Sequence, residues 1–513
     1  MKSLVKDRFK LCFYFIIGFY LISHLLFLTK LPVFADEAIY IRWAQLIIDD
    51  WQRYAFFPMN DGKPPLFLWL LVPGQFIFQN QLLAGRVLSV LIGFFQLIVL
   101  QKLTRRLGGD KIAQIFSMLL GCCLPFWFFH HRMALMDGAL TLFSSLTWLF
   151  ALKARGELKR KNKIESKLLL NLLLTGLFLG LSFLIKLPAV LLIPLIPISL
   201  ILFLAKEKLF KACALSGVPV LTGLFIFSLL RLHPAFPQLF SRGGDFLFTL
   251  EEIFTQQEWR TVLKQMPKYG TTLSTYLTWP VILLSFYAFF TKHRRAAWIS
   301  HLSWMAFAYP IFLMGKVVYP RYLLPVTPFI TVAASLGFSH LFSQLQSKLQ
   351  STSKKILQVL IFLIIIIISG RSLLFMFTQY TDPSQSNFVP IDQEQYLYEW
   401  SAGYGISETV SLLNQLAKTK KVLVLTEGYF GTLPDGLLMY LHRRPVDNLF
   451  ITGIGQPINQ LKSSKNTSNF DQVLLVANSH RINNPLNNSR LILEICRPHK
   501  APCHQVWDIT AEF

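Results

Sequence analysis

The chain has 513 residues, of which 53% are hydrophobic and only 15% are charged. A soluble domain carries about 25% charged residues, so this composition excludes a series of soluble domains, a disordered chain and a coiled-coil or collagen-like rod. The mean hydropathy of +0.46 instead predicts a polytopic α-helical membrane protein. In such a protein the net charge of +23 is spread over alternate loops and sets the orientation, so no nucleic-acid partner is expected.

Eleven apolar runs reach the length of a membrane span, which needs about 20 mostly apolar residues. We expect spans at residues 11–29, 82–101, 112–129, 136–152, 168–185, 188–205, 212–230, 273–290, 297–314, 322–344 and 356–375. The short segments between alternate spans, such as 102–111 and 153–167, are rich in Lys and Arg, which predicts that they lie in the cytoplasm. The N-terminus is therefore expected in the cytoplasm and the C-terminal end outside it. The expected location is the plasma (inner) membrane, with the endoplasmic reticulum as the alternative.

Residues 377–513 differ in composition from the membrane domain expected over residues 1–376. Short apolar runs bounded by polar residues are typical of buried strands. We expect strands at 421–426, 472–477, 491–495 and 506–509 and helices at 407–418 and 434–442, hence a small extracytoplasmic α/β domain. Cys496 and Cys503 lie in this domain, where a disulfide could persist, and the sequence leaves their pairing open.

An amphipathic helix is expected directly after the first span. Ile39 and Trp43 fall on its apolar face and Gln45 on its polar face. Such a helix is expected to lie along the outer membrane surface. Asp36 suits its N-cap, a role that needs one carboxylate and leaves Glu37 unexplained.

Five cations lie at or near the outer ends of the predicted spans, against the positive-inside trend. They are Lys63, Arg132, Lys186, Lys316 and Arg321. Any one of them alone is explained by a long side chain that extends to the membrane interface. Together, drawn from separate segments on one membrane face, they suggest a shared anionic ligand, and a lipid phosphate lies at that depth. Lys binds phosphate as a point charge and Arg as a bidentate fork.

Carboxylates are concentrated in the same places. Asp36 and Glu37 follow the first span, and Asp137 adjoins the apolar run of the fourth. A carboxylate beside an apolar run is costly, which indicates a role in function. These three residues are candidate catalytic groups, because a positioned carboxylate can accept the proton of a hydroxyl nucleophile.

The order of these residues resembles the GT-C glycosyltransferases of the dolichyl-phosphate-mannose–protein mannosyltransferase superfamily, which includes the bacterial lipid A aminoarabinose transferases. The resemblance extends over residues 1–375. The matching motifs are Asp36-Glu37, Lys63-Pro64-Pro65, Arg132 with Asp137, Phe183-Leu184-Ile185-Lys186 and Pro320-Arg321-Tyr322-Leu323-Leu324-Pro325.

The resemblance implies the transfer of a single sugar from a polyprenyl-phosphate donor to an acceptor hydroxyl, with inversion, on the non-cytoplasmic face. The donor lipid would be undecaprenyl phosphate in a bacterium, and the acceptor a protein, a lipid or a surface glycan. Asp36 matches the base of the family, and Glu37 and Asp137 are expected to position the acceptor or the sugar.

The resemblance also assigns the cations. Lys63 and Lys186 match family lysines that contact the lipid phosphate, and we expect Arg321 and Arg132 to bind the phosphate with them. In the aminoarabinose transferases an acidic residue directly precedes the loop lysine and can bind a metal. Here Gly62 occupies that place, so no metal ligands are expected and a divalent ion as cofactor stays open.

A lipid-linked sugar transporter or flippase without transferase activity is the alternative. Transporters place ionisable groups near the middle of the membrane and often contain inverted repeats. In this chain the charges gather at one face and no repeat is evident. A receptor or scaffold without catalysis would leave that group of charges unexplained.

Overall fold

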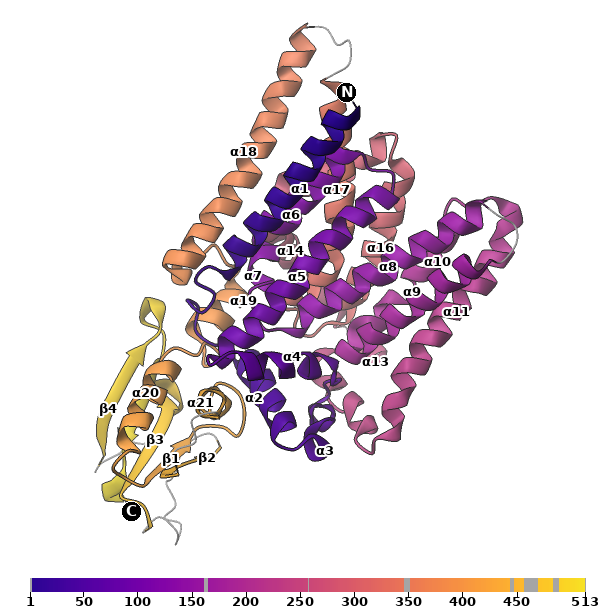
Figure 1. The fold of residues 1–513 in the computed structure, drawn as a ribbon. Coiled ribbons are helices and arrows are strands. Elements are labelled where there is room, and N and C mark those ends of the chain that lie inside the picture. The colour runs from indigo at the N-terminus through magenta and orange to yellow at the C-terminus, as the bar shows by residue number, and fades with distance from the viewer. Residues whose placement is uncertain are drawn as a thin grey trace.

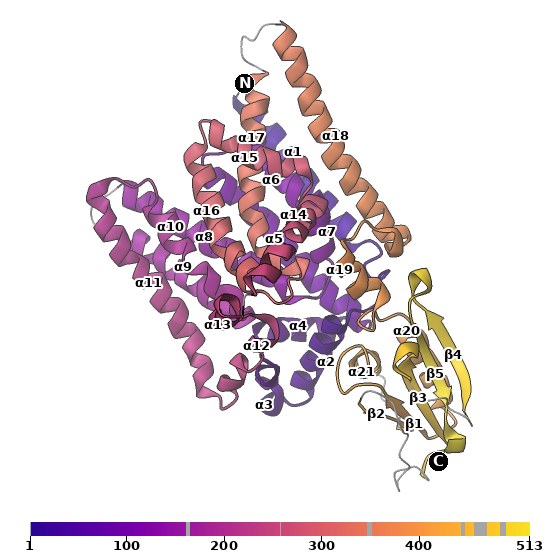
Figure 2. The ribbon, with the colours of Figure 1, turned by 180° about the vertical axis from the view of Figure 1, so that it is seen from behind.

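The computed structural model describes residues 2–160, 165–256, 258–345, 351–442, 447–455, 469–482 and 489–512. In this part of the chain long helices form a bundle, and a smaller domain with a sheet lies at one end of it (Figure 1). The view from behind shows the same two parts (Figure 2). The predicted fold, a helical membrane protein with a C-terminal α/β domain, is therefore confirmed.

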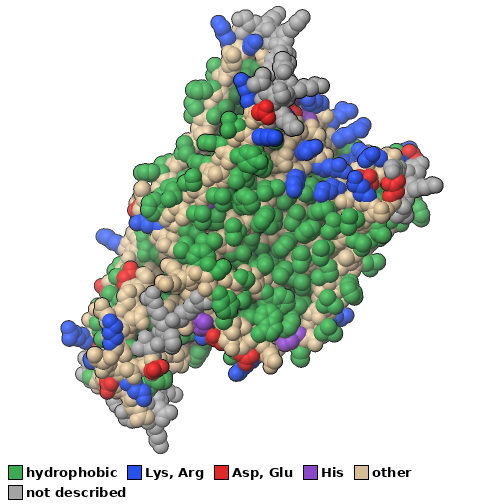
Figure 3. Space-filling view, viewed as in Figure 1, with side chains coloured by type: hydrophobic (Ala, Val, Ile, Leu, Met, Phe, Trp, Pro, Cys, Tyr) green, Lys and Arg blue, Asp and Glu red, His purple; other side chains and the backbone are tan. Residues whose placement is uncertain are grey.

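Seven helices among the described residues are long and apolar enough to cross a membrane. Two further helices, bent relative to each other, reach that length and hydropathy only when they are taken as one pair. The seven include α1 (Lys2–Leu25), α5 (Gln81–Arg106), α9 (Ser166–Ile185), α11 (Leu209–Ser228), α16 (Arg294–Met314), α17 (Thr327–Gln344) and α18 (Ser351–Thr381). Hydrophobic side chains cover the flank of the bundle, and Lys and Arg gather toward the end that holds the N-terminus (Figure 3). This pattern belongs to a multi-pass membrane protein.

Four of the eleven predicted spans differ from the structure. Three of them are broken at proline, which has no N–H to donate and clashes with the preceding turn. The elements concerned are α6 (Lys111–Cys123) and α7 (Pro125–His130), the 3-10 helix η2 (Leu187–Leu192) and α10 (Leu195–Ile201), and α14 (Trp259–Leu277) and α15 (Trp279–Tyr287). The last pair is bent by 97° at Thr278, just before Pro280.

The fourth is the predicted span 136–152, which lies within α8 (Met136–Arg160). This helix is long, but it is not among the helices apolar enough to cross a membrane by composition. Its buried residues include the hydroxyl side chains of Thr141, Ser144 and Thr147, which donate to backbone carbonyls one turn earlier in the helix. Their polarity is thus satisfied inside the protein.

Helix α2 (Ala35–Asp49) lies between the bundle and the C-terminal domain, and its position along the membrane surface stays a prediction. Ile39 and Trp43 pack into the core of the bundle, whereas Ile41 packs with the core of the C-terminal domain. Gln45, on the face expected to meet water, is fully buried and donates to the Met439 carbonyl at 2.8 Å. The polar face is covered by protein because the second domain docks on it.

The N-terminus of α2 is capped by Glu37, not by Asp36 as expected. The helix begins at Ala35, and the Phe34 N–H donates to Glu37 Oε2 at 3.1 Å. A carboxylate three residues into a helix commonly reaches back to such a free N–H. The Asp36 carboxylate is thereby left available for another role.

The C-terminal domain contains a mixed sheet with the strand order β2-β1-β3-β5-β4. Its strands are β1 (Val422–Thr426), β2 (Leu449–Gly453), β3 (Gln472–Asn478), β4 (Arg490–Cys496) and β5 (Cys503–Asp508), with helices α20 (Ile406–Leu416) and α21 (Asp435–Leu441). Strand β1 is parallel to β2 and β3, and β5 is antiparallel to β3 and β4. The four predicted strands and both helices are present, β2 was not predicted, and Cys496 and Cys503 form a disulfide.

The two domains join where α2 begins. The Ala35 N–H donates to the Ser401 carbonyl at 2.9 Å, and the Gly403 N–H donates to the Val33 carbonyl at 2.8 Å. These strand-like bonds fix the backbone on both sides of Phe34. The division predicted at residue 376 stays a prediction, since α18 continues to Thr381.

Candidate active site

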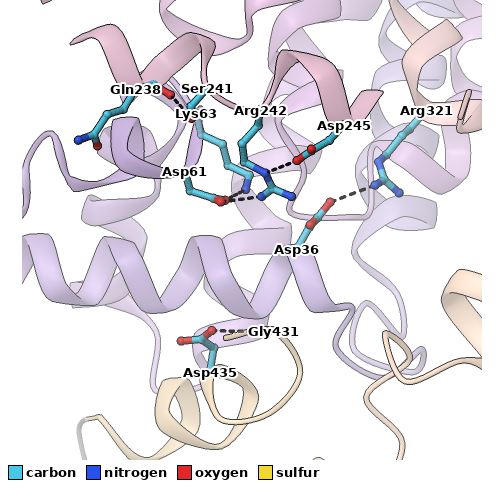
Figure 4. A network of polar contacts seen from close by, with 10 residues as sticks. All are labelled: Asp36, Asp61, Lys63, Gln238, Ser241, Arg242, Asp245, Arg321, Gly431 and Asp435. Carbon is cyan, nitrogen blue, oxygen red and sulfur yellow. Dashed lines mark hydrogen bonds and ion pairs between the residues drawn. The ribbon is translucent and has the colours of Figure 1, made fainter. Parts of the chain in front are cut away.

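Asp36 and Arg321 form an ion pair at the end of the bundle that adjoins the C-terminal domain (Figure 4). Arg321 Nη2 lies 3.1 Å from Asp36 Oδ2. The guanidinium is 8% exposed and lies over the rings of Phe34, Tyr319 and Tyr322 at 5.2, 4.6 and 5.6 Å. The carboxylate keeps 26% of its surface exposed, so it can be reached from outside the protein.

A second ion pair joins Asp137 and Lys186. Asp137 lies in the first turn of α8, and Lys186 directly follows α9. Their charged atoms are 2.8 Å apart, with the carboxylate buried and the ammonium 22% exposed. The Lys186 ammonium also lies 4.3 Å from the ring centroid of Tyr322, whose ring Arg321 approaches as well. One aromatic ring therefore adjoins the cations of both pairs.

Tyr40 shows that the two pairs belong to one site. It lies one turn after Asp36 on α2 and is buried. Burial raises the pKa of Tyr40 well above its ordinary value, and the charges of Asp36 and Asp137 raise it further while Arg321 lowers it. Both carboxylates and the guanidinium thus lie close enough to act on one hydroxyl.

Lys63 belongs to a polar group beside these pairs. Its ammonium donates to Asp61, whose other carboxylate oxygen accepts from Arg242 Nη1 at 2.6 Å. Figure 4 shows this group next to Asp36 and Arg321, with Asp245 bound to Arg242. The ammonium lies 5.2 Å from the ring centroid of Trp43 and 5.9 Å from that of Tyr40. Lys63 is therefore connected to the Asp36 site through Tyr40.

Two predicted site residues have other contacts. The fully buried Glu37 carboxylate pairs with Arg86 at 2.6 Å and accepts the Ala134 N–H at 2.7 Å. The buried Arg132 guanidinium donates to the carbonyls at the end of α1, those of Ser23, His24, Leu26 and Phe27. The structure does not bring these two side chains into the group around Asp36. Lys316, the remaining outer cation, pairs with Glu252 at 3.0 Å.

Three residues of the site were missed by sequence reasoning, and they follow α18. Gln395 accepts from Arg321 Nη1, and Asp392 accepts from the Tyr276 hydroxyl at 2.5 Å. Burial raises the pKa of Asp392 to about 7, although the hydrogen bond from Tyr276 and the positive charge of Arg321 both act to lower it. Tyr396 is buried and acts electrostatically on the same guanidinium. These residues lie on α19 (Pro390–Gln393) and the π-helical turn Glu394–Tyr398, an irregularity that is frequent at functional sites.

Sequence reasoning also missed Arg242, which lies in the segment between α11 and α14. The one feature of the sequence that could have indicated it is its positive charge on the membrane face where the positive-inside trend predicts few cations. Asp61 and Lys63 meet because the intervening Gly62 has φ +71, a turn conformation that favours glycine. Asp61 lies one position earlier than the acidic residue of the aminoarabinose transferases, but it still pairs directly with Lys63.

The acidic residue next to the loop lysine is paired with cations in this structure. The Asp61 carboxylate already binds two cations, Lys63 and Arg242. Within the described ranges, the one group of three metal-type ligands is Glu494 with Cys496 and Cys503, and both of these cysteines are in the disulfide. No chemical step is therefore assigned to a metal.

Comparisons with known proteins bear on the fold. Residues 62–231 match the family model described as dolichyl-phosphate-mannose-protein mannosyltransferase. The structure is similar to that of ArnT from Cupriavidus metallidurans bound to undecaprenyl phosphate, with 15% identity, a TM-score of 0.60 and 97% of each chain covered. It is also similar to the oligosaccharyltransferase AglB from Archaeoglobus fulgidus in complex with an inhibitory peptide and a dolichol-phosphate, with 13% identity, a TM-score of 0.52 and 90% and 69% of the two chains covered.

No curated protein matches the chain significantly. At these identities the likeness to solved structures shows the fold, and both of these structures have the GT-C architecture. The superfamily resemblance expected from the sequence is confirmed by the family match and by this architecture.

Proposed function

We infer that this chain, which has the fold of the GT-C glycosyltransferases, is itself a glycosyltransferase. It moves a single sugar from a polyprenyl-phosphate donor to an acceptor hydroxyl, with inversion, on the non-cytoplasmic face of the plasma membrane. The observation that carries this proposal is the pairing of a partly exposed carboxylate, Asp36, with the buried guanidinium of Arg321, beside the Asp137–Lys186 pair. The undecaprenyl phosphate of the ArnT structure and the dolichol-phosphate of the AglB structure support a donor of this class.

Asp36 is the proposed base. A hydroxyl is a weak nucleophile until a positioned carboxylate accepts its proton. As the acceptor oxygen forms its bond to the anomeric carbon, the bond from that carbon to the phosphate oxygen breaks on the opposite face, which inverts the configuration. The bonding electrons leave with the lipid phosphate, and the proton passes to Asp36.

Lys63, Lys186 and Arg321 are the proposed phosphate clamp. The departing phosphate gains negative charge, and fixed cations in a partly dry site stabilise that charge better than water does. Each of these cations is held by a carboxylate, and each lies against an aromatic ring. The carboxylate partners keep the cations in place before the donor arrives.

The other predicted residues have positioning roles in this proposal. Asp137 orients Lys186 and can contact the sugar, since it lies within electrostatic reach of Tyr40 as Asp36 does. Glu37 fixes the start of α2 through Arg86 and the Ala134 N–H. Arg132 holds the end of α1 through backbone carbonyls, and in this proposal it does not contact the phosphate directly.

Release of free polyprenyl phosphate tests the proposal. The purified chain, reconstituted in vesicles, is given a panel of polyprenyl-phosphate sugars together with a crude acceptor extract. A transferase releases the lipid phosphate and transfers the sugar from at least one donor. Movement of the intact donor between leaflets without release would instead identify a lipid-linked sugar transporter.

A further inference from the structure

An apolar cavity of about 500 Å³ lies among α1, α6, α17 and α18. Its lining runs along α6 from Lys111 to Cys123, and Arg8 of α1 lines it as well. Arg8 lies near the start of α1, and Lys111 lies against Phe9 of the same helix, whereas Asp36 lies at the start of α2. The N-terminus lies at the end of the bundle away from the C-terminal domain, and α2 lies at the end near that domain (Figure 1). The cavity is therefore separate from the site described above, and the inference drawn from it does not depend on the proposed glycosyl transfer.

The cavity is open to the surroundings of the helix bundle. Leu119, Ile365 and Leu373 line it and are 37%, 43% and 58% exposed, in a part of the chain where exposed side chains face lipid. Because lipid is the solvent there, a ligand with a hydrocarbon chain can enter from the side. The volume also lies within the roughly 300–1,000 Å³ that is usual for ligand pockets.

The length of the cavity matches one leaflet of a bilayer. Lys111 and Cys123 lie at the two ends of α6, which at about 1.5 Å per residue corresponds to about 18 Å. The hydrocarbon core of a bilayer is about 30 Å thick, so one leaflet is about 15 Å deep. An acyl chain of a lipid whose head lies beside Lys111 would thus fill the cavity to its inner end.

The charges at the mouth favour an anionic head. Arg8 is exposed, and the Lys111 ammonium lies 5.7 Å from the ring centroid of Phe9, on the same turn of α1 as Arg8. Two nearby acids, Asp7 and Asp110, are exposed, and neither of them lines the cavity. The charged residues that line the cavity, Arg8 and Lys111, are therefore both cations. Basic pockets between membrane helices are known to bind anionic lipid heads.

We propose that this cavity binds one acyl chain of an anionic phospholipid from the leaflet at the N-terminal end of the bundle, with Arg8 and Lys111 at its phosphate. The lipid binds between α1 and α18, the first and the last helices long and apolar enough to span a membrane. It therefore joins the two ends of the membrane domain. The donor lipid is not the occupant, because the cations assigned to its phosphate lie at the opposite end of the bundle.

Native mass spectrometry of the full-length protein with added lipid tests this proposal. Phosphatidylglycerol is compared with phosphatidylcholine of the same chain length. We expect phosphatidylglycerol to be retained more strongly, and the double variant Arg8→Ala/Lys111→Ala to weaken its retention by about fivefold for each cation removed. The matched control Lys102→Ala/Arg105→Ala removes two exposed cations from the end of α5 that do not line the cavity, and it should change nothing.

A second variant tests the cavity itself. Leu119→Trp/Ile365→Trp changes two partly exposed lining residues and fills the space, so it should reduce retention of both lipids while the lipid-free protein still melts near the wild-type temperature. Equal retention of the two lipids, or an unchanged result with the Arg8 and Lys111 variant, would overturn the proposal. Displacement of phosphatidylglycerol by polyprenyl phosphate would also overturn it, because the cavity would then hold the donor chain.

Discussion

Arg321 binds the carboxylate of Asp36 with one nitrogen and the amide oxygen of Gln395 with another, across 285 and 74 residues of chain. The first partner begins the helix that follows the first span, and the second lies beyond the last span. The guanidinium thus connects three distant segments, one of which belongs to the C-terminal part of the chain. The site is complete only when that part is docked on α2.

Two replacements of Arg321 should distinguish the contribution of its positive charge to sugar transfer from that of its planar shape. Arg321→Lys keeps a cation but cannot reach both Asp36 and Gln395 as the planar fork does. We expect sugar transfer to fall on the order of tenfold in Arg321→Lys and on the order of a hundredfold in Arg321→Gln. Turnover and donor KM measured with a saturating acceptor check this. A turnover number unchanged in Arg321→Gln would contradict the assignment to the phosphate clamp.

Asp137 and Lys186 should act as one unit. Because their ion pair is mostly buried, removing either partner leaves the other uncompensated. A double-mutant cycle with Asp137→Asn and Lys186→Met should give a coupling of about 1 kcal/mol or more in donor affinity. Tritium-labelled donor binding to the four proteins measures it. Additive effects would show that the two residues serve the donor independently.

Glu37 should matter for stability more than for chemistry. Its carboxylate is fully buried against Arg86, and breaking such a pair typically costs about 3–5 kcal/mol. Glu37→Gln is therefore expected to lower the thermal unfolding temperature strongly, whereas Glu37→Leu/Arg86→Met should restore part of the loss by removing both charges. Thermal unfolding in detergent measures both variants. If Glu37→Gln kept the wild-type unfolding temperature but lost turnover, Glu37 would have a catalytic role instead of a structural one.

Asp392 should make stability depend on pH. Burial raises its pKa from 3.8 to about 7, so between these values the folded protein holds a proton that the unfolded chain has released. The free energy of unfolding contributed by this group therefore falls as the pH rises from about 4 to about 7 and then levels off. Asp392→Asn keeps an oxygen that can accept the hydrogen bond from Tyr276 but cannot titrate. The unfolding temperature of wild type relative to Asp392→Asn should decrease over this range, and a constant difference would contradict the prediction.

The sequence could predict the site residues whose charge departs from the pattern of a membrane protein. Lys63, Lys186 and Arg321 are cations on the face where the positive-inside trend predicts few, and Asp36 is a carboxylate next to a span. The broken spans were also visible in principle, because Pro125, Pro194 and Pro280 mark them.

What the sequence could not predict depends on docking between distant segments. The polar face of α2 gave the pattern of a surface helix, since nothing local indicates that a second domain covers Gln45. Glu37 rather than Asp36 caps α2 because the helix begins two residues earlier than expected, with Phe34 instead of Asp36 at the N-cap position. Asp392 and Gln395 resemble ordinary polar residues of a soluble segment until that segment packs against Arg321 and Tyr276.

The most direct test of the account is the release of polyprenyl phosphate by Asp36→Asn. Asn cannot accept a proton from the acceptor, but it can still accept a hydrogen bond from Arg321, so the donor should bind nearly as it does to wild type. We expect release to fall by on the order of a thousandfold with donor affinity little changed, whereas Asp447→Asn, an exposed control in the C-terminal domain, should behave as wild type. Release by Asp36→Asn at the wild-type rate would contradict the assignment of the base and, with it, the proposed mechanism.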